Sequence, residues 1–107
     1  MYITDEELIR LREAVIQIGK LVKKHGRKYY SPQLRQLGRM LQCIDSDAAP
    51  DVKTEFLVNC YLSLFHPKCG LSEFYIHDDD PETLRRLNEP LDEAVDTMRE
   101  ILKPYAV

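Results

Sequence analysis

Apolar residues near the start of the chain recur three and four positions apart, which is the spacing of one face of an α-helix. The positions of this stripe are Leu8, Leu11, Val15, Ile18 and Val22. Thr4 and Glu7 precede it as a capping box, in which each side chain accepts a hydrogen bond from the backbone amide of the other. Gly26 follows it and is typical of a left-handed residue that closes a helix. The pattern predicts a helix over residues 5–25.

Two further stripes indicate two more helices. Ser31 suits the cap position and Pro32 the first turn of the second helix. The link from the first helix is short, so we expect the two to run antiparallel. The second stripe is Leu34, Leu37, Leu41 and Ile44. The third helix is predicted from about residue 51 to residue 65. It ends before Pro67, because the residue that precedes a proline disfavours the helical conformation. Its stripe is Val52, Phe56, Cys60 and Leu64.

The last helical pattern begins where Asp80 can cap a helix and Pro81 can occupy its first turn. Its apolar positions are Leu84, Leu87, Leu91, Val95, Met98 and Leu102. Pro90 lies inside this pattern, where it removes a backbone hydrogen bond. We therefore expect a short helix over residues 81–87 and a separate helix that starts with Asn88 as its cap and ends near residue 103.

These patterns predict an all-α fold: an antiparallel bundle of four main helices, a short extra helix before the last, and an extended loop at about 66–80. Only four glycines occur in 107 residues, which argues against an all-β fold with many tight turns. The length fits one domain, residues 1–107. The predicted core is Leu8, Leu11, Val15, Ile18, Val22, Leu34, Leu37, Leu41, Val52, Phe56, Cys60, Leu64, Leu91, Val95, Met98 and Leu102.

The segment from residue 69 to residue 80 is the longest one without helical spacing. It contains an apolar-aromatic run and then three acids. We expect Leu71, Phe74 and Ile76 to point inward, because exposed apolar surface is unfavourable in water. The remaining side chains then face outward as a partner-binding surface, an aromatic anchor with a charged rim. That surface is Tyr75, His77, Asp78, Asp79 and Asp80.

A basic cluster ends the first predicted helix, beside Tyr29 and Tyr30. It consists of Lys20, Lys23, Lys24, Arg27 and Lys28. Cations next to aromatic rings can hold phosphates and stack bases, so a nucleic-acid or phosphate binder is an alternative function. Cations are also favoured at any helix C-terminus by the helix dipole. The net acidity of the chain makes nucleic acid the less favoured partner.

A second alternative is a small metalloprotein that uses His66, Cys69 and His77. A zinc site needs four ligands, commonly in two close pairs, and the sequence offers one such pair, His66 and Cys69. We therefore predict no bound metal. Cys69 beside a histidine could also act as a nucleophile, but no orienting group or oxyanion pocket is identifiable, so we predict no catalytic residues.

The charge is distributed unevenly. The net charge is −3, yet residues 1–47 carry nine Lys or Arg against six Asp or Glu, and residues 48–107 carry six against twelve. No run approaches the ~20 apolar residues of a membrane helix, and the acidic residues Asp5 to Glu7 are unlike the start of a secretory signal. We expect a cytoplasmic protein, monomeric or homodimeric, with no cofactor and no membrane partner.

Two segments carry a resemblance. Residues 70–76 read Gly-Leu-Ser-Glu-Phe-Tyr-Ile, and residues 88–92 read Asn-Glu-Pro-Leu-Asp. They resemble a family of small, mostly uncharacterised bacterial helical domains in which a Gly-Leu/Ser-Ser-Asp-aromatic turn precedes the last helix, although Glu73 stands where that pattern has Asp. The resemblance covers the last third of the chain and implies no catalytic residue. By size and charge the chain also resembles immunity proteins. We expect a bacterial protein-interaction module, immunity-like or regulatory.

Overall fold

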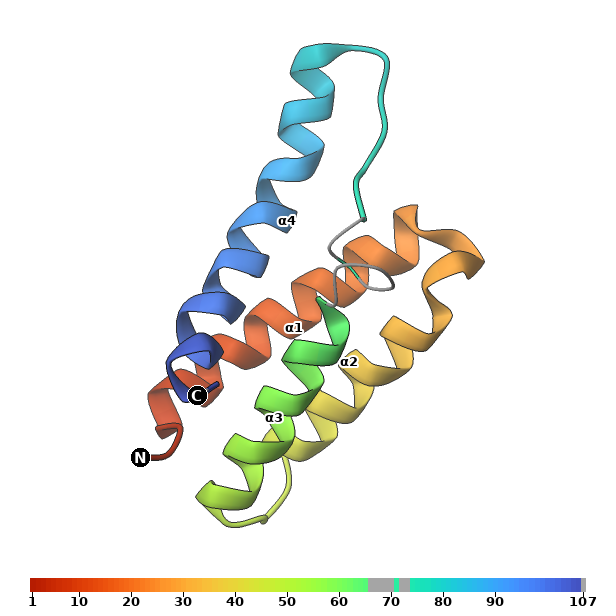
Figure 1. Cartoon of the computed structure of the whole chain (residues 1–107). Helices are drawn as coiled ribbons and strands as arrows, with labels where there is room; N and C mark the ends of the chain where they lie inside the picture. Colours follow the sequence, from red (N-terminus) through yellow and green to blue (C-terminus); the bar gives the residue numbers. More distant parts are fainter. Residues whose placement is uncertain (66–70, 72–73, 107) are drawn as a thin grey trace.

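The computed structural model describes residues 1–65, 71 and 74–106. Within these ranges the chain forms four α-helices and no β-strand. The helices are α1 (Asp5–His25), α2 (Ser31–Ile44), α3 (Pro50–Leu64) and α4 (Pro81–Leu102). Two short 3-10 turns, η1 (Arg27–Tyr30) and η3 (Lys103–Tyr105), follow α1 and α4 (Figure 1). The predicted all-α class is confirmed.

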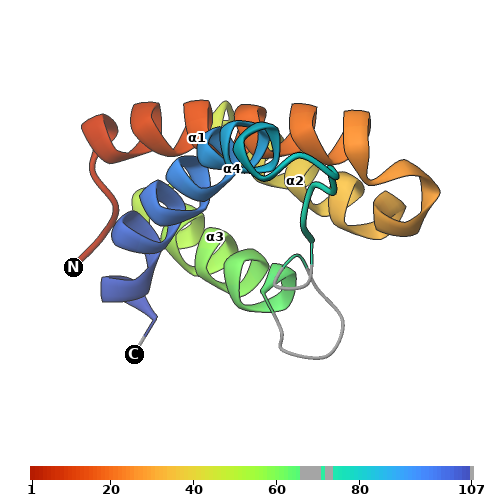
Figure 2. The same cartoon turned by 90° about the horizontal axis from the view of Figure 1, so that it is seen from above.

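The helix α1 packs against both α2 and α4, and α3 packs against α2 and α4. In Figure 1, α2 runs back along α1 and α3 runs back along α2. Figure 2 shows α4 between α1 and α3, crossing α1 at a steep angle. The molecule is elongated, 46 × 24 × 24 Å, because the first half of α4 and the segment before it stand out from the body (Figure 1). We call residues 74–88 the arm.

The start of α1 is the predicted one. The amide of Glu7 donates to Oγ1 of Thr4 at 3.1 Å, and the amide of Thr4 donates to Oε1 of Glu7 at 3.0 Å. The capping box is confirmed, and so are the bounds 5–25. Nearby, the amide of Ile3 donates to Oγ1 of Thr54 at 2.9 Å. This bond ties the segment before α1 to α3.

The prediction of a left-handed Gly26 is wrong. Its φ is −86° and its ψ is −10°, so the backbone continues in a right-handed conformation into η1. Glycine is needed there for space instead. A Cβ atom would lie 2.7 Å from the carbonyl oxygen of Val22 and 2.9 Å from the ring of Tyr30. The continuing turn also moves the cap of α2 to Tyr30, so Ser31 is the first helical residue rather than the predicted cap.

The predicted buried stripe of α3 is half wrong. Cys60 and Leu64 are buried, but Val52 is 54% exposed and Phe56 is 38% exposed. Leu57 and Val58 are buried in their place. Apolar residues lie nearly all round α3, so their spacing alone cannot select the inward face. Packing against α2 and α4 selects it.

The predicted break at Pro90 is also wrong. The helix α4 runs through Pro90 as one element of 22 residues. Asn88 does not cap a new helix, since it is buried within α4 and its side chain bonds elsewhere. Asp80 is the cap of α4, as predicted: its Oδ2 accepts from the amide of Thr83 at 3.0 Å.

The core lies where the helices meet. Most predicted members are buried: Leu11, Val15, Ile18, Val22, Leu37, Cys60, Leu64, Leu91, Met98 and Leu102. Four predicted members are partly buried against them: Leu8, Leu34, Leu41 and Val95. Met40, Ile44 and Ile101 are buried with them, and Ile44 belongs to the predicted stripe of the second helix. In the part of the chain that the structure covers, none of the helices combines the length and apolar character that crossing a membrane requires.

Candidate functional site

The arm begins with a segment whose alternate side chains point inward. Phe74 is 8% exposed and Ile76 is 2% exposed, and Leu71 just before them is 6% exposed. The predicted inward direction of these three is confirmed. His66, Cys69 and Gly70, which precede these three residues, lie outside the described part of the chain.

The side chain of Asn88 binds the backbone of this segment at Ile76. Its Oδ1 accepts from the amide of Ile76 at 3.0 Å, and its Nδ2 donates to the carbonyl of Ile76 at 2.9 Å. The same Nδ2 donates to the carbonyl of Leu84 at 2.9 Å. The carboxamide thus satisfies both the amide and the carbonyl of Ile76, as the backbone of a neighbouring β-strand would. A buried backbone group without such a partner is costly, so this pairing fixes residue 76.

Phe74 is held at the other side of Tyr75. Its ring meets the ring of Tyr30 edge to face, with centroids 5.1 Å apart. Gly26 lies beneath both rings, and a Cβ atom there would come within 3.3 Å of the Phe74 ring. Such aromatic pairs are stabilising beyond the area they bury. The segment is therefore anchored through Phe74 on Gly26 and Tyr30, which follow α1, and through Ile76 on α4.

Tyr75 lies between these two anchors and points outward. It is 53% exposed, and its ring meets the His77 ring edge to face at 6.1 Å. His77 is exposed as well. The structure therefore brings two of the predicted site residues together as an aromatic pair on the surface.

The three acids form the turn that leads into α4. The carboxylate of Asp78 accepts from the amide of Asp80 at 2.9 Å, and Asp80 accepts from both the amide and the hydroxyl of Thr83. The hydrogen bonds from Thr83 lower the pKa of Asp80. Asp79 and Asp80 are exposed and Asp78 is half-exposed. Figure 1 shows this turn at the far end of the arm.

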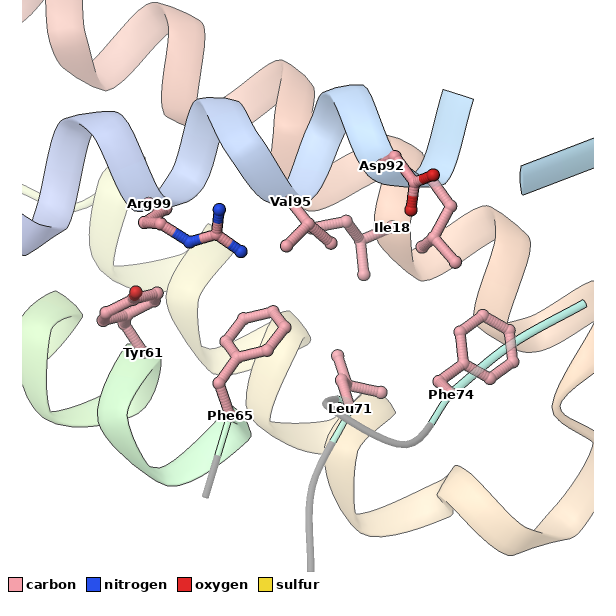
Figure 3. A pocket seen from close by; sticks show the side chains of 9 residues that line it. Ile18, Tyr61, Phe65, Leu71, Phe74, Asp92, Val95 and Arg99 are labelled. Atoms are coloured by element: carbon pink, nitrogen blue, oxygen red, sulfur yellow. The ribbon is translucent and has the colours of Figure 1, made fainter. Parts of the chain in front are cut away.

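The inner side of the segment closes a pocket of about 350 Å³. Leu71 and Phe74 contribute to its wall. Tyr61 of α3 and Phe65, the residue that follows α3, lie across from them (Figure 3). The rings of Tyr61 and Phe65 are 5.5 Å apart. Asp92 and Arg99, two turns apart on α4, stand at opposite ends of the pocket (Figure 3). This arrangement can accept a ligand with an apolar middle, a positively charged group near Asp92 and a negatively charged group near Arg99.

The predicted basic cluster is partly described. Lys20, Lys23 and Lys24 are exposed on the last turns of α1. The side chains of Arg27 and Lys28 lie outside the described part. Lys20 and Lys23 edge a groove between α1 and α2. The nucleic-acid alternative stays a prediction.

The metal hypothesis also stays a prediction. Among the residues that the structure covers, no three His, Cys, Asp or Glu side chains gather as a metal site would need. His66 and Cys69 are not among them, so the predicted ligand set of His66, Cys69 and His77 is not described. Burial raises the pKa of Cys43 and of Cys60, which keeps both thiols neutral.

Three residues of this region were missed by sequence reasoning. Asn88 anchors the arm, and Asp92 and Arg99 edge the pocket. One signal could have indicated the first: Asn88 is a polar residue on the apolar stripe that passes through Leu84, Leu91 and Val95. A polar side chain on a buried stripe usually has a partner.

No protein-family model, no curated protein and no solved structure matches this chain. The resemblance to small bacterial helical domains therefore stays a prediction.

Proposed function

We propose that this protein is a small interaction module that binds another protein through the exposed side of residues 75–80. The observation that carries the proposal is the double anchoring of Tyr75. Phe74 and Ile76 fix the backbone on either side, so Tyr75 is presented with little freedom left to lose. Tyrosine is enriched among residues that dominate binding energy, and ordering costs on association are smaller for a surface that is already fixed.

The charge of the turn supports a partner with a basic surface. The turn over residues 78–80 lies at the end of the arm, away from the other helices (Figure 1). Complementary charge speeds association and selects among partners. We propose an immunity-like or regulatory role in which the module occupies a basic functional surface of its partner. The role is one of binding rather than catalysis.

The test is capture of a partner from lysate with immobilised wild-type protein, followed by purification of the captured protein and direct measurement of Kd. Tyr75→Ala should weaken binding by at least about tenfold, as expected of a central aromatic residue. Asp78→Lys with Asp79→Lys should lower mainly the association rate. Tyr75→Ala should keep the melting temperature of the wild type, because its side chain is exposed. The double lysine variant should melt slightly lower, because it loses the hydrogen bond from the amide of Asp80 to Asp78, and it should remain folded.

Tyr29→Ala is the matched control. Tyr29 is 86% exposed and lies in η1 rather than in the arm. It should bind the partner as the wild type does. A partner whose affinity is unchanged by Tyr75→Ala and by the double lysine variant would show that the binding surface lies elsewhere.

A further inference from the structure

A groove with apolar walls runs along the outer side of the α1–α2 pair. Its volume is about 270 Å³. Ile16 of α1 and Leu34 and Leu41 of α2 contribute to its walls, and all three are only half-buried. Lys20 and Lys23 form its edge and are exposed. The groove is therefore apolar inside with positive charge along one side.

Two helical glycines, Gly19 of α1 and Gly38 of α2, line the groove. A Cβ atom added at either position would meet no atom within 4 Å. Glycine is the least favourable residue in a helix interior apart from proline. Close packing inside this chain does not account for these two, because the space beside them is open. They are suited to the close approach of a backbone from outside.

A ridge of complementary chemistry lies on α3. Val52 and Phe56, one turn apart, are 54% and 38% exposed. Asp51 and Glu55 stand beside them and are exposed. Lys53 lies on the same helix, and its Nζ donates to the carbonyl of Ile44 at 3.0 Å rather than to either carboxylate. The ridge thus carries apolar side chains with negative charge.

We propose that the α3 ridge of one copy of this chain binds the α1–α2 groove of a second copy. The apolar pair Val52 and Phe56 would cover the two glycines, as ridges of one helix fit the grooves between others. The carboxylates of Asp51 and Glu55 would lie toward the lysine edge. A symmetric contact between two α3 ridges would instead place acids against acids, which is unfavourable.

The proposed contact is heterologous, because it joins two different surfaces of the chain. Each copy in a pair therefore keeps one free groove and one free ridge. Further copies add until a ring closes or the material grows into open chains. Small interfaces of this kind are weak, so we expect association to rise with concentration and to weaken with added salt, which screens the ion pairs.

Sedimentation equilibrium up to about 1 mM protein tests the proposal, a range chosen because small interfaces bind weakly. The groove variant is Gly19→Leu with Gly38→Leu, which fills the hollow with residues that favour helix. The ridge variant is Val52→Gln with Phe56→Gln. Each variant alone should be monomeric at concentrations where the wild type associates. An equimolar mixture of the two should form a one-to-one heterodimer, because one intact groove and one intact ridge remain.

Ile9→Gln is the control, since Ile9 is 64% exposed on α1 and does not line the groove. It should associate as the wild type does. Helical circular dichroism and melting of every variant must show that it is folded. A wild type that stays monomeric overturns the proposal. The proposal is also overturned if the groove variant associates as the wild type does while the ridge variant is monomeric. A mixture of the two variants that stays monomeric overturns it as well.

Discussion

The hydroxyl of Tyr105 donates a hydrogen bond of 2.6 Å to Oε1 of Glu7, 98 positions earlier in the chain. The same carboxylate oxygen accepts from the amide and from the hydroxyl of Thr4. The turn after α4 thereby completes the cap at the start of α1. The bond from Tyr105 is the main reason that the pKa of Glu7 is lowered, and the same bond raises the pKa of Tyr105.

Tyr105→Phe should lower the free energy of unfolding by about 1 kcal/mol at neutral pH, the usual contribution of one hydrogen bond. The folded pKa of Glu7 lies below the ordinary value of 4.5. The ionised carboxylate therefore stabilises the fold fully above that value, and this contribution is lost as pH falls through the folded pKa. The difference between variant and wild type should shrink on acidification. Urea unfolding across this pH range measures it.

Tyr2→Phe is the matched control for this effect. Tyr2 is 57% exposed, and only its backbone carbonyl receives a bond from Tyr105, at 3.3 Å. Its stability should follow that of the wild type at each pH. An equal loss in Tyr2→Phe and Tyr105→Phe would contradict the role of the Glu7 bond.

Asn88→Leu should destabilise the protein by about 2–4 kcal/mol. The substitution leaves the buried amide and carbonyl of Ile76 without partners, and each such group costs about 1–3 kcal/mol. Glu89→Leu, at the neighbouring exposed position, should change stability by less than about 0.5 kcal/mol. Urea unfolding followed by circular dichroism compares the two. Equal stabilities would mean that Asn88 is not the anchor of the arm.

The three described glycines should respond to alanine with opposite signs. Gly26→Ala should destabilise by about 1–3 kcal/mol, since its Cβ overlaps the Val22 carbonyl and the Tyr30 ring. Gly19→Ala and Gly38→Ala should each stabilise by about 0.5–1 kcal/mol, the helical advantage of alanine. Thermal melting of the three variants is sufficient. Stabilisation by Gly26→Ala would refute the close packing at the end of α1.

The inward face of α3 can be tested with two valines. Val58 is 8% exposed and Val52 is 54% exposed. Val58→Ala should lower the free energy of unfolding by about 1.5–3 kcal/mol, the contribution of a buried side chain of this size. Val52→Ala should change it by less than about 0.5 kcal/mol. A larger loss of stability in Val52→Ala than in Val58→Ala would show that Val52 lies on the inward face of α3, as the sequence pattern predicts.

Local signals made most helices predictable. The Thr4–Glu7 box and the Asp80 cap involve residues three positions apart, so their geometry follows from the helix itself. The inward direction of Phe74 and Ile76 also followed from their apolar character. The orientation of α3 did not, because a helix that is apolar nearly all round does not specify its own inward face.

Long-range contacts explain the remaining errors. Sequence rules place Asn at helix caps and place breaks near Pro. Here the Asn88 side chain is hydrogen-bonded to the backbone of residue 76, twelve positions earlier, and α4 continues through Pro90. Likewise, glycine is required at position 26 because the rings of Tyr30 and Phe74 leave no room for a Cβ atom, and not because the backbone adopts a conformation that only glycine favours. The groove and the pocket depend on how two or more helices pack, which no single stripe encodes.

Pro90 has a consequence for the local stability of the arm. Because proline has no amide hydrogen, the carbonyl of Arg86 receives no backbone bond from residue 90. The helical ladder is thus weakened where the arm leaves the body, and the arm can open as a cooperative unit of its own. Native-state hydrogen exchange should show amides of residues 74–88 opening at a lower free energy than those of residues 91–102. A partner bound at Tyr75 should slow exchange in the first set and leave the second nearly unchanged.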